Sequence, residues 1–187
     1  MPELFNPRLV LTPVDKSGPL LSLSDLIRQL EQLNFLAKLK VSEAQFQCYE
    51  IGEDFLHQIS FLGCSPTLFS DKNDQDIFIS IIEHDDIMFS HSSDVPPPRC
   101  PHCRKTDKNW KQYRQQWDNN KDSSVSCPNC GETFSFTEMK WKKNGGYGRI
   151  LIQVHGVQEN LAVPNPDFLE ALNKLTQTEW EYFFADH

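Results

Sequence analysis

Hydrophobic residues recur at steps of three and four in one early stretch of the chain. Leucine or isoleucine at positions 23, 26, 27, 30 and 33 would form a single apolar face, which predicts an amphipathic helix over Ser22–Leu39. Ser22 and Asp25 stand three positions apart at its start, and this spacing predicts a capping box. A helix with one apolar face is typically packed on a sheet, so we expect this one to cover strands.

Three stretches before residue 90 have the patterns of strands. Ala44–Ile51 and Phe55–Leu62 alternate between apolar and polar residues across a short polar turn, which predicts a hairpin. Ile77–Ile82 is apolar except at Ser80, and such a run predicts a central strand that is covered on both faces. Residues 1–21 carry four prolines and are predicted to form an arm without regular structure that packs on the body.

The last third of the chain predicts two further strands and one helix. Met139–Val157 is predicted to form a long hairpin whose turn is the Asn-Gly-Gly sequence at 144–146. Pro164–Leu175 is predicted to be a helix, with Asn165 as its N-cap and proline at the first helical position. Glu179–Phe184 alternates and predicts a final strand, parallel or nearly parallel to the strand that precedes the helix.

Four cysteines interrupt these patterns in the middle of the chain. Cys100 and Cys103 form one pair, Cys127 and Cys130 form another, and 23 residues separate the pairs. Cysteines two residues apart can turn both sulfurs toward one point, so two such turns can close a tetrahedral four-sulfur metal site. Disulfides are the competing interpretation; they belong to oxidising compartments, whereas the N-terminal residues lack the pattern of a secretory signal. The spacing therefore favours a metal ion and a cytoplasmic protein.

The second pair, read with its neighbours as Cys-Pro-Asn-Cys-Gly, resembles the knuckle of a zinc ribbon. This resemblance covers residues 97–137. The first pair departs from the family pattern, because Arg104 stands where a glycine is common, and this departure also argues against rubredoxin. The resemblance implies one Zn²⁺ per chain, held in a closed structural site by Cys100, Cys103, Cys127 and Cys130.

The order of the elements predicts an α+β fold. We expect a mixed or antiparallel sheet with two helices on one face, of which a ferredoxin-like variant is one form. The four-cysteine zinc ribbon would be an insertion in this body. The proline-rich stretch Asp94–Pro98 predicts a linker. The predicted division is therefore an N-terminal part of the body over 1–95, the ribbon over 96–138, and a C-terminal part over 139–187 that completes the body. Two sub-domains that flank the ribbon are the alternative.

Charge is distributed unevenly between the ribbon and the body. The chain has a formal net charge of −8, yet residues 99–149 hold 11 basic and 5 acidic residues. Cations that alternate with aromatic rings can bind a phosphate backbone and stack on bases, so a nucleic-acid partner is one prediction and a protein partner is another. The same aromatic residues could instead form the small core of the ribbon. The candidate partner-binding residues are Trp110, Tyr113, Trp117, Lys140, Lys142 and Lys143.

An enzyme is the alternative function. The sequence contains no glycine-rich phosphate loop, nucleophile elbow or His-Glu-x-x-His motif. A catalytic site would have to be assembled from scattered residues, such as Cys64 with His57, or the polar cluster Glu83–His91. No run reaches the roughly 20 apolar residues that a membrane-spanning helix needs, so a membrane partner is not expected.

Overall fold

The computed structural model describes residues 7–16, 22–43, 45–62, 77–157 and 161–186. The prediction of an α+β fold is confirmed, because a largely antiparallel sheet combines with four helices in the described residues. The elements are β1 (Arg8–Pro13), α1 (Leu23–Gln32), β2 (Leu36–Glu43), β3 (Phe46–Ile51), α2 (Phe55–Gln58), β4 (Ile59–Phe61), β5 (Phe78–His91), α3 (Trp110–Asn119), β6 (Ser124–Ser126), β7 (Thr133–Ser135), the short 3₁₀ helix η1 (Phe136–Glu138), β8 (Gly145–His155), β9 (Ala162–Pro164), α4 (Pro166–Thr176) and β10 (Trp180–Ala185).

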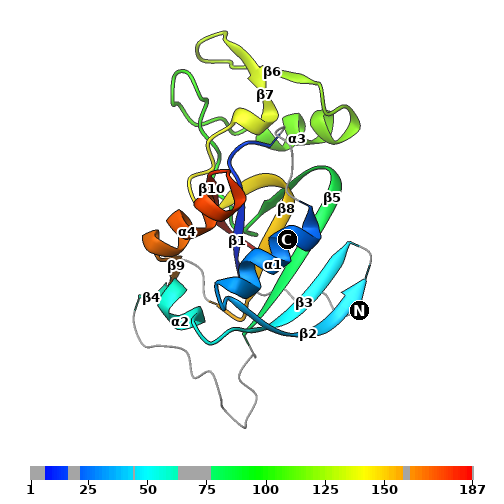
Figure 1. Cartoon of the computed structure of the whole chain (residues 1–187). Coiled ribbons are helices and arrows are strands. Elements are labelled where there is room, and N and C mark those ends of the chain that lie inside the picture. The colour runs from blue at the N-terminus through cyan, green and yellow to red at the C-terminus, as the bar shows by residue number, and fades with distance from the viewer. Residues whose placement is uncertain (1–6, 17–21, 44, 63–76, 158–160, 187) are drawn as a thin grey trace.

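Six strands form the main sheet in the order β10-β1-β8-β5-β3-β2, and every pair of neighbours is antiparallel (Figure 1). Both β8 and β10 are antiparallel to β1, so they are parallel to each other with β1 between them. The strands β10-β1-β8-β5, with α1 after β1 and α4 after β8, have the order and directions of a ferredoxin-like sheet. The hairpin of β2 and β3 extends this sheet along β5.

The two long helices α1 and α4 cover the same face of the sheet. Leu26 and Leu30 of α1 lie in one cluster with Phe168 and Leu172 of α4, and all four are buried. The sheet contributes alternate residues to this cluster: Leu9, Leu11, Ile79, Ile81, Ile150, Ile152 and Val154. Residues of the opposite parity, such as Val10, lie in a separate cluster on the other face. The alternation therefore places both helices on one side.

Several elements confirm the sequence predictions. The run at 77–82 opens β5, one of the two central strands, and the alternating run at 44–51 contains β3. Helix α4 begins with Pro166, and the Asn165 side chain accepts a hydrogen bond from the backbone N–H of Asp167. At the start of α1, the Ser22 side chain accepts from the N–H of Asp25, which is one half of the predicted capping box; the Asp25 carboxylate accepts from the Ser22 hydroxyl and not from the Ser22 N–H that would complete it.

The predicted arm over residues 1–21 is wrong where the structure describes it, because β1 lies inside the sheet. Leu9, Val10 and Leu11 have no exposed surface. This apolar run is too short to mark a strand by alternation, and Pro13 stands at its last position, beyond the residues of β1 that pair with β8. Strand β1 is recognisable only through its neighbours β8 and β10, which come from the other end of the sequence.

The first predicted helix ends earlier than Leu39. It stops at Gln32, and Asn34, at φ 52°, turns the chain into β2. The carbonyl of Asn34 approaches Gly52 so closely that a Cβ there would lie 1.9 Å from its oxygen. The periodic leucines alone did not reveal this stop, because leucine also suits the strand that follows.

The predicted hairpin between residues 44–51 and 55–62 is also wrong. Strand β3 pairs with β2 and β5, whereas residues 55–58 form the short helix α2, and β4 pairs with β9. The buried Gln58 side chain donates to the carbonyl of Leu33, which ties α2 to the end of α1. A run of only eight residues fits a short helix and a short strand as well as one long strand.

The predicted hairpin over Met139–Val157 is a single strand, β8, which pairs with β5 and β1. The glycines that suggested a turn lie within this strand. A Cβ at Gly146 would lie 2.4 Å from the Phe183 ring, and a Cβ at Gly148 would lie 2.1 Å from Thr12 Oγ1. These glycines therefore allow close packing of neighbouring side chains, and the chain reverses through the residues between β5 and β8.

The cysteine-containing segment connects β5 to β8. His91 at the end of β5 pairs with Gly145 at the start of β8, so residues 92–144 replace the turn of a long hairpin. In Figure 1 this segment, with α3, β6 and β7, lies beyond the end of the sheet. We call residues 92–144 the metal-binding segment below.

Candidate metal centre

Two similar turns carry the cysteines. In the first turn the N–H of Arg104 donates to the carbonyl of Cys100 at 3.1 Å, and in the second the N–H of Gly131 donates to Cys127 at 2.9 Å. The residue after each cysteine pair has positive φ, 61° at Arg104 and 78° at Gly131. Arg104 thus adopts the conformation for which glycine is favoured, and its turn has the same form as the Cys-Pro-Asn-Cys-Gly turn.

The four sulfur atoms lie close enough to bind one metal ion. All of them are within 4.8 Å of one another. The Sγ atoms of Cys100 and Cys130 are 3.9 Å apart, and those of Cys103 and Cys127 are 3.8 Å apart. Four sulfurs bonded at about 2.3 Å to a tetrahedral ion are separated by about 3.8 Å, whereas a disulfide requires about 2.05 Å. The residues therefore fit a four-thiolate metal site.

The backbone around the second turn stabilises one thiolate. Burial opposes ionisation of Cys127, but the N–H groups of Asn129 and Cys130 donate to its sulfur, and the pKa of Cys127 is lowered to about 6. The N–H of Glu132 likewise favours the thiolate of Cys130, yet burial and the neighbouring sulfurs outweigh it, and the pKa of Cys130 is raised to about 12. A bound cation would offset the burial and the repulsion between sulfurs that disfavour the Cys130 thiolate, because it attracts all four thiolates.

A cluster of aromatic rings surrounds the cysteines and joins them to the sheet. Trp110, Trp117, Phe136 and Trp141 from the metal-binding segment pack with residues of both flanking strands. Phe89 of β5 lies 4.6 Å from Trp141 between ring centroids. The remaining buried members are Cys100, Cys127, Val125, Phe134, Met139 and Tyr147. We call this set the segment core.

A buried hydrogen-bond chain crosses the segment core. The indole Nε1 of Trp141 donates to the hydroxyl of Tyr147 at 2.5 Å, and this hydroxyl donates to the carbonyl of Phe136 at 2.7 Å. Tyr147 lies in β8, whereas its two partners belong to the metal-binding segment. Burial raises the pKa of Tyr147 well above its ordinary value, with the Trp141 hydrogen bond opposing this, so the hydroxyl stays protonated and can donate.

The structure places the predicted partner-binding aromatic residues mostly inside the protein. Trp110 is 5 % exposed and Trp117 is 2 % exposed, so neither ring offers an open face on which a base can stack. Tyr113 is half-buried, and its hydroxyl donates to Asp107 at 3.3 Å. The regular spacing of these rings, which suggested recognition, instead reflects the buried side of α3.

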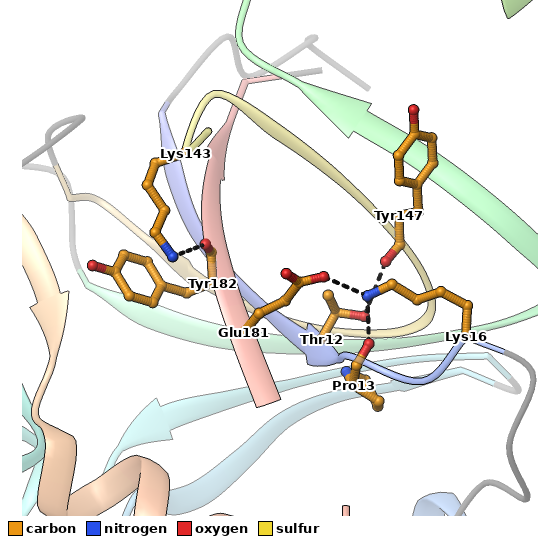
Figure 2. A network of polar contacts seen from close by, with 7 residues as sticks. All are labelled: Thr12, Pro13, Lys16, Lys143, Tyr147, Glu181 and Tyr182. Atoms are coloured by element: carbon orange, nitrogen blue, oxygen red, sulfur yellow. Dashed lines mark hydrogen bonds and ion pairs between the residues drawn. The ribbon is translucent and has the colours of Figure 1, made fainter. Parts of the chain in front are cut away.

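The predicted partner-binding lysines fall into two groups. Lys143 is held by the C-terminal strand: its Nζ donates to the carbonyl of Tyr182 at 3.0 Å and lies 3.6 Å from the centroid of that ring (Figure 2). Lys140 and Lys142 are exposed. They line a cleft of about 790 Å³ between the metal-binding segment and the sheet, together with Arg99 and Arg104, which the sequence analysis did not select.

Lys16 also lines this cleft. Its Nζ donates to Glu181 Oε1 at 2.7 Å and to the carbonyl of Pro13, as Figure 2 shows. Its side chain is only 17 % exposed. Burial lowers the pKa of Lys16, and the hydrogen bond and charge of Glu181 oppose that shift. Lys16 therefore contributes a cation that Glu181 already neutralises.

The residues of the enzymatic alternative are only partly described by the structure. Cys64 lies outside the described residues, and His57 is exposed at the end of α2. The Glu83–His91 cluster is part of the extended strand β5, and His91 Nε2 accepts a hydrogen bond from Arg114 at 2.7 Å. Among the described residues, only the four cysteines form a group of potential ligands close enough to share a metal ion.

A comparison of the chain with protein-family models, with curated proteins and with solved structures finds no significant match. Within the part of the chain that the structure describes, no helix is both long and apolar enough to span a membrane.

Introducing glycine after the first cysteine pair and removing it after the second should have opposite effects on stability. Positive φ costs a non-glycine residue about 1–2 kcal/mol, whereas glycine costs about 0.5–1 kcal/mol in lost chain entropy. We expect Arg104→Gly to raise the free energy of unfolding by about 0.5–1 kcal/mol and Gly131→Ala to lower it by a similar amount, as measured by urea denaturation. A Cβ at Gly131 would meet no atom within 4 Å, so the backbone conformation alone decides whether Gly131→Ala raises or lowers the free energy of unfolding. Equal stability of both variants would contradict this account.

Proposed function

We propose that Cys100, Cys103, Cys127 and Cys130 bind one Zn²⁺, and that the chain is a recognition protein whose metal is structural. The observation that carries this proposal is the convergence of four sulfur atoms within 4.8 Å. All four ligands would come from the protein, which leaves no coordination position for water or substrate. A closed site of this kind stabilises a fold and does not perform catalysis.

Zinc is the proposed ion because of the ligand set and its setting. Thiolates suit zinc and iron alike, but four-thiolate iron sites serve electron transfer, whereas zinc has no redox chemistry. A structural role also agrees with the position of the site beside the segment core, since Cys100 and Cys127 are themselves buried members of that core. Metal binding and packing of the aromatic rings would therefore stabilise each other.

The proposed organisation follows from this role. Residues 96–138 would form a zinc-stabilised module, and residues 1–95 and 139–187 would form the two halves of the α+β body. Residues 99–149, which cover most of the module and the stretch that follows it, hold 11 basic and 5 acidic residues. A rigid cationic module inserted into an acidic body is suited to binding a protein or a nucleic acid with negative charge.

Elemental analysis of the purified chain tests the metal proposal. We expect about one zinc per chain and no iron, and we expect four thiols to resist alkylation until a chelator removes the metal. Near-UV circular dichroism should then change, because three of the four tryptophans lie in the segment core. An iron content near one per chain, or cystines among these four residues, would contradict the proposal.

A further inference from the structure

The cleft between the metal-binding segment and the sheet gathers cations at a cost to stability. Four exposed side chains line it: Arg99, Arg104, Lys140 and Lys142. None of the four forms a side-chain hydrogen bond or an ion pair with another described residue. Three carboxylates line the same cleft: Glu181 binds Lys16, Asp15 also interacts with the charge of Lys16, and Glu138 accepts from the N–H of Ser135 at 2.6 Å.

Two of these cations occupy strained backbone positions. Among the described residues, four that are not glycine have positive φ, and two of them are Arg104 at 61° and Lys142 at 59°. Asn34 and Gln177, the other two, follow helices, where a left-handed residue is an ordinary ending. Glycine would relieve the strain at both cleft positions. Departures from local preference of this kind concentrate at functional sites.

The other two cations face each other directly. Arg99 and Lys140 form an antiparallel bridge in which each N–H donates to the other's carbonyl at 3.0 Å. Opposed residues in such a bridge project on the same side, and like charges there repel each other. No carboxylate within ion-pair distance of either side chain belongs to the described residues. An anion between them would convert this repulsion into attraction.

From these three features we infer that the cleft binds the phosphodiester backbone of single-stranded nucleic acid. Arginine forks match the oxygens of a phosphate, and the lysines add point charges along the same path. A volume of about 790 Å³ is suited to a nucleotide-sized portion of a flexible strand. A concave cleft favours a single strand over the wider and stiffer duplex. The buried tryptophans leave little surface for stacking, so binding through charge predicts weak preference among base sequences.

This inference rests on the proposed recognition function and names its partner. If four phosphates are contacted, a plot of the logarithm of the binding constant against the logarithm of salt concentration should have a slope of about −3. The probe is a fluorescein-labelled oligo-deoxythymidine of about twelve nucleotides, followed by fluorescence anisotropy with the full chain. The competitor is polyglutamate with the same number of charges.

The decisive variant is Arg104→Gly combined with Lys142→Gly. It removes two cations at positions where glycine relieves strain, so loss of folding cannot account for loss of binding. We expect affinity to fall at least about tenfold and the salt slope to fall by about half, while the melting temperature stays the same or rises. Gln177→Gly is the matched control, because it makes the same backbone change at an exposed position of α4's C-cap without removing a charge.

Three outcomes would overturn the inference: affinity unchanged in the double variant, an equal loss in Gln177→Gly, or polyglutamate binding as tight as the oligonucleotide. The last outcome would assign the cleft to an acidic protein segment. The metal content of the same preparation separates the two proposals. One zinc per chain without oligonucleotide binding would reject the nucleic-acid partner alone, whereas charge-dependent binding by a chain without zinc would reject the metal alone.

Discussion

Cys127→Ser is expected to abolish metal binding and to unfold the metal-binding segment while the six-stranded sheet persists. Cys127 is 2 % exposed, belongs to the segment core and has a thiolate that backbone N–H groups stabilise. Structural zinc sites contribute roughly 10–16 kcal/mol of binding free energy in small peptides, so with the proposed zinc bound, loss of one thiolate would remove a large part of the stability of this segment.

Two measurements on Cys127→Ser separate local from global unfolding. Tryptophan emission should shift to longer wavelength, since Trp110, Trp117 and Trp141 lie in the segment core, whereas the far-UV circular dichroism of the sheet should largely remain. Cys48→Ser is the control: Cys48 is buried in β3, away from the four-sulfur group, and its variant should retain the metal. A full metal content in Cys127→Ser would contradict the assignment.

Trp117→Ala is expected to destabilise the protein by about 3–5 kcal/mol, the usual cost of removing a buried aromatic side chain. The Trp117 ring is 2 % exposed and lies 5.6 Å from the Phe136 ring and 6.0 Å from the Tyr147 ring, as measured between centroids. Lys121 caps its other side, with Nζ 3.4 Å from the centroid. Urea denaturation followed by tryptophan fluorescence measures the loss.

Tyr113→Ala provides the comparison for Trp117→Ala. Tyr113 belongs to the same helix, but its ring is half-buried at the edge of the segment core, so its removal should cost distinctly less. Equal losses in the two variants would show that burial does not distinguish them. Because Trp117→Ala is expected to unfold the segment, weaker partner binding by that variant would not identify Trp117 as a contact residue.

The sequence predicted those features whose physical cause is local. The cysteine spacing predicted the convergence of the sulfurs, because each pair needs only one turn. Asn165 predicted the start of α4 through a cap that forms within three residues. The run at 77–82, apolar except at Ser80, predicted a strand covered on both faces, and β5 is indeed central.

The features that the sequence missed depend on partners distant in the chain. The apolar run in β1 needs β8 and β10 to define it as a strand. Gly146 resembles a turn residue until Phe183 is placed against it. Likewise, the pattern of Trp110 and Trp117 on α3 fits an outward or an inward face equally well, and only the packed rings decide between these alternatives.

The cationic cleft, too, could be predicted from the sequence only in part. Arg104 carried a local signal, because it replaces the glycine expected after a cysteine pair. Its relation to Lys142 and to the Arg99–Lys140 bridge could not be deduced from spacing, since the bridge joins residues on opposite sides of the cysteines. Positive φ at a charged residue is therefore a conformational signal that appears only once backbone angles are known.

The position of β1 between β8 and β10 also bears on how the sheet forms during synthesis. Leu9 pairs with Val154 on one side and with Phe184 on the other, so both neighbours of β1 leave the ribosome only after most of the chain. Loops of this length make folding slow, and the apolar first strand remains available to chaperones or to other nascent chains during that delay. The two cysteine turns, which are much closer to each other in sequence, can meet well before the sheet closes.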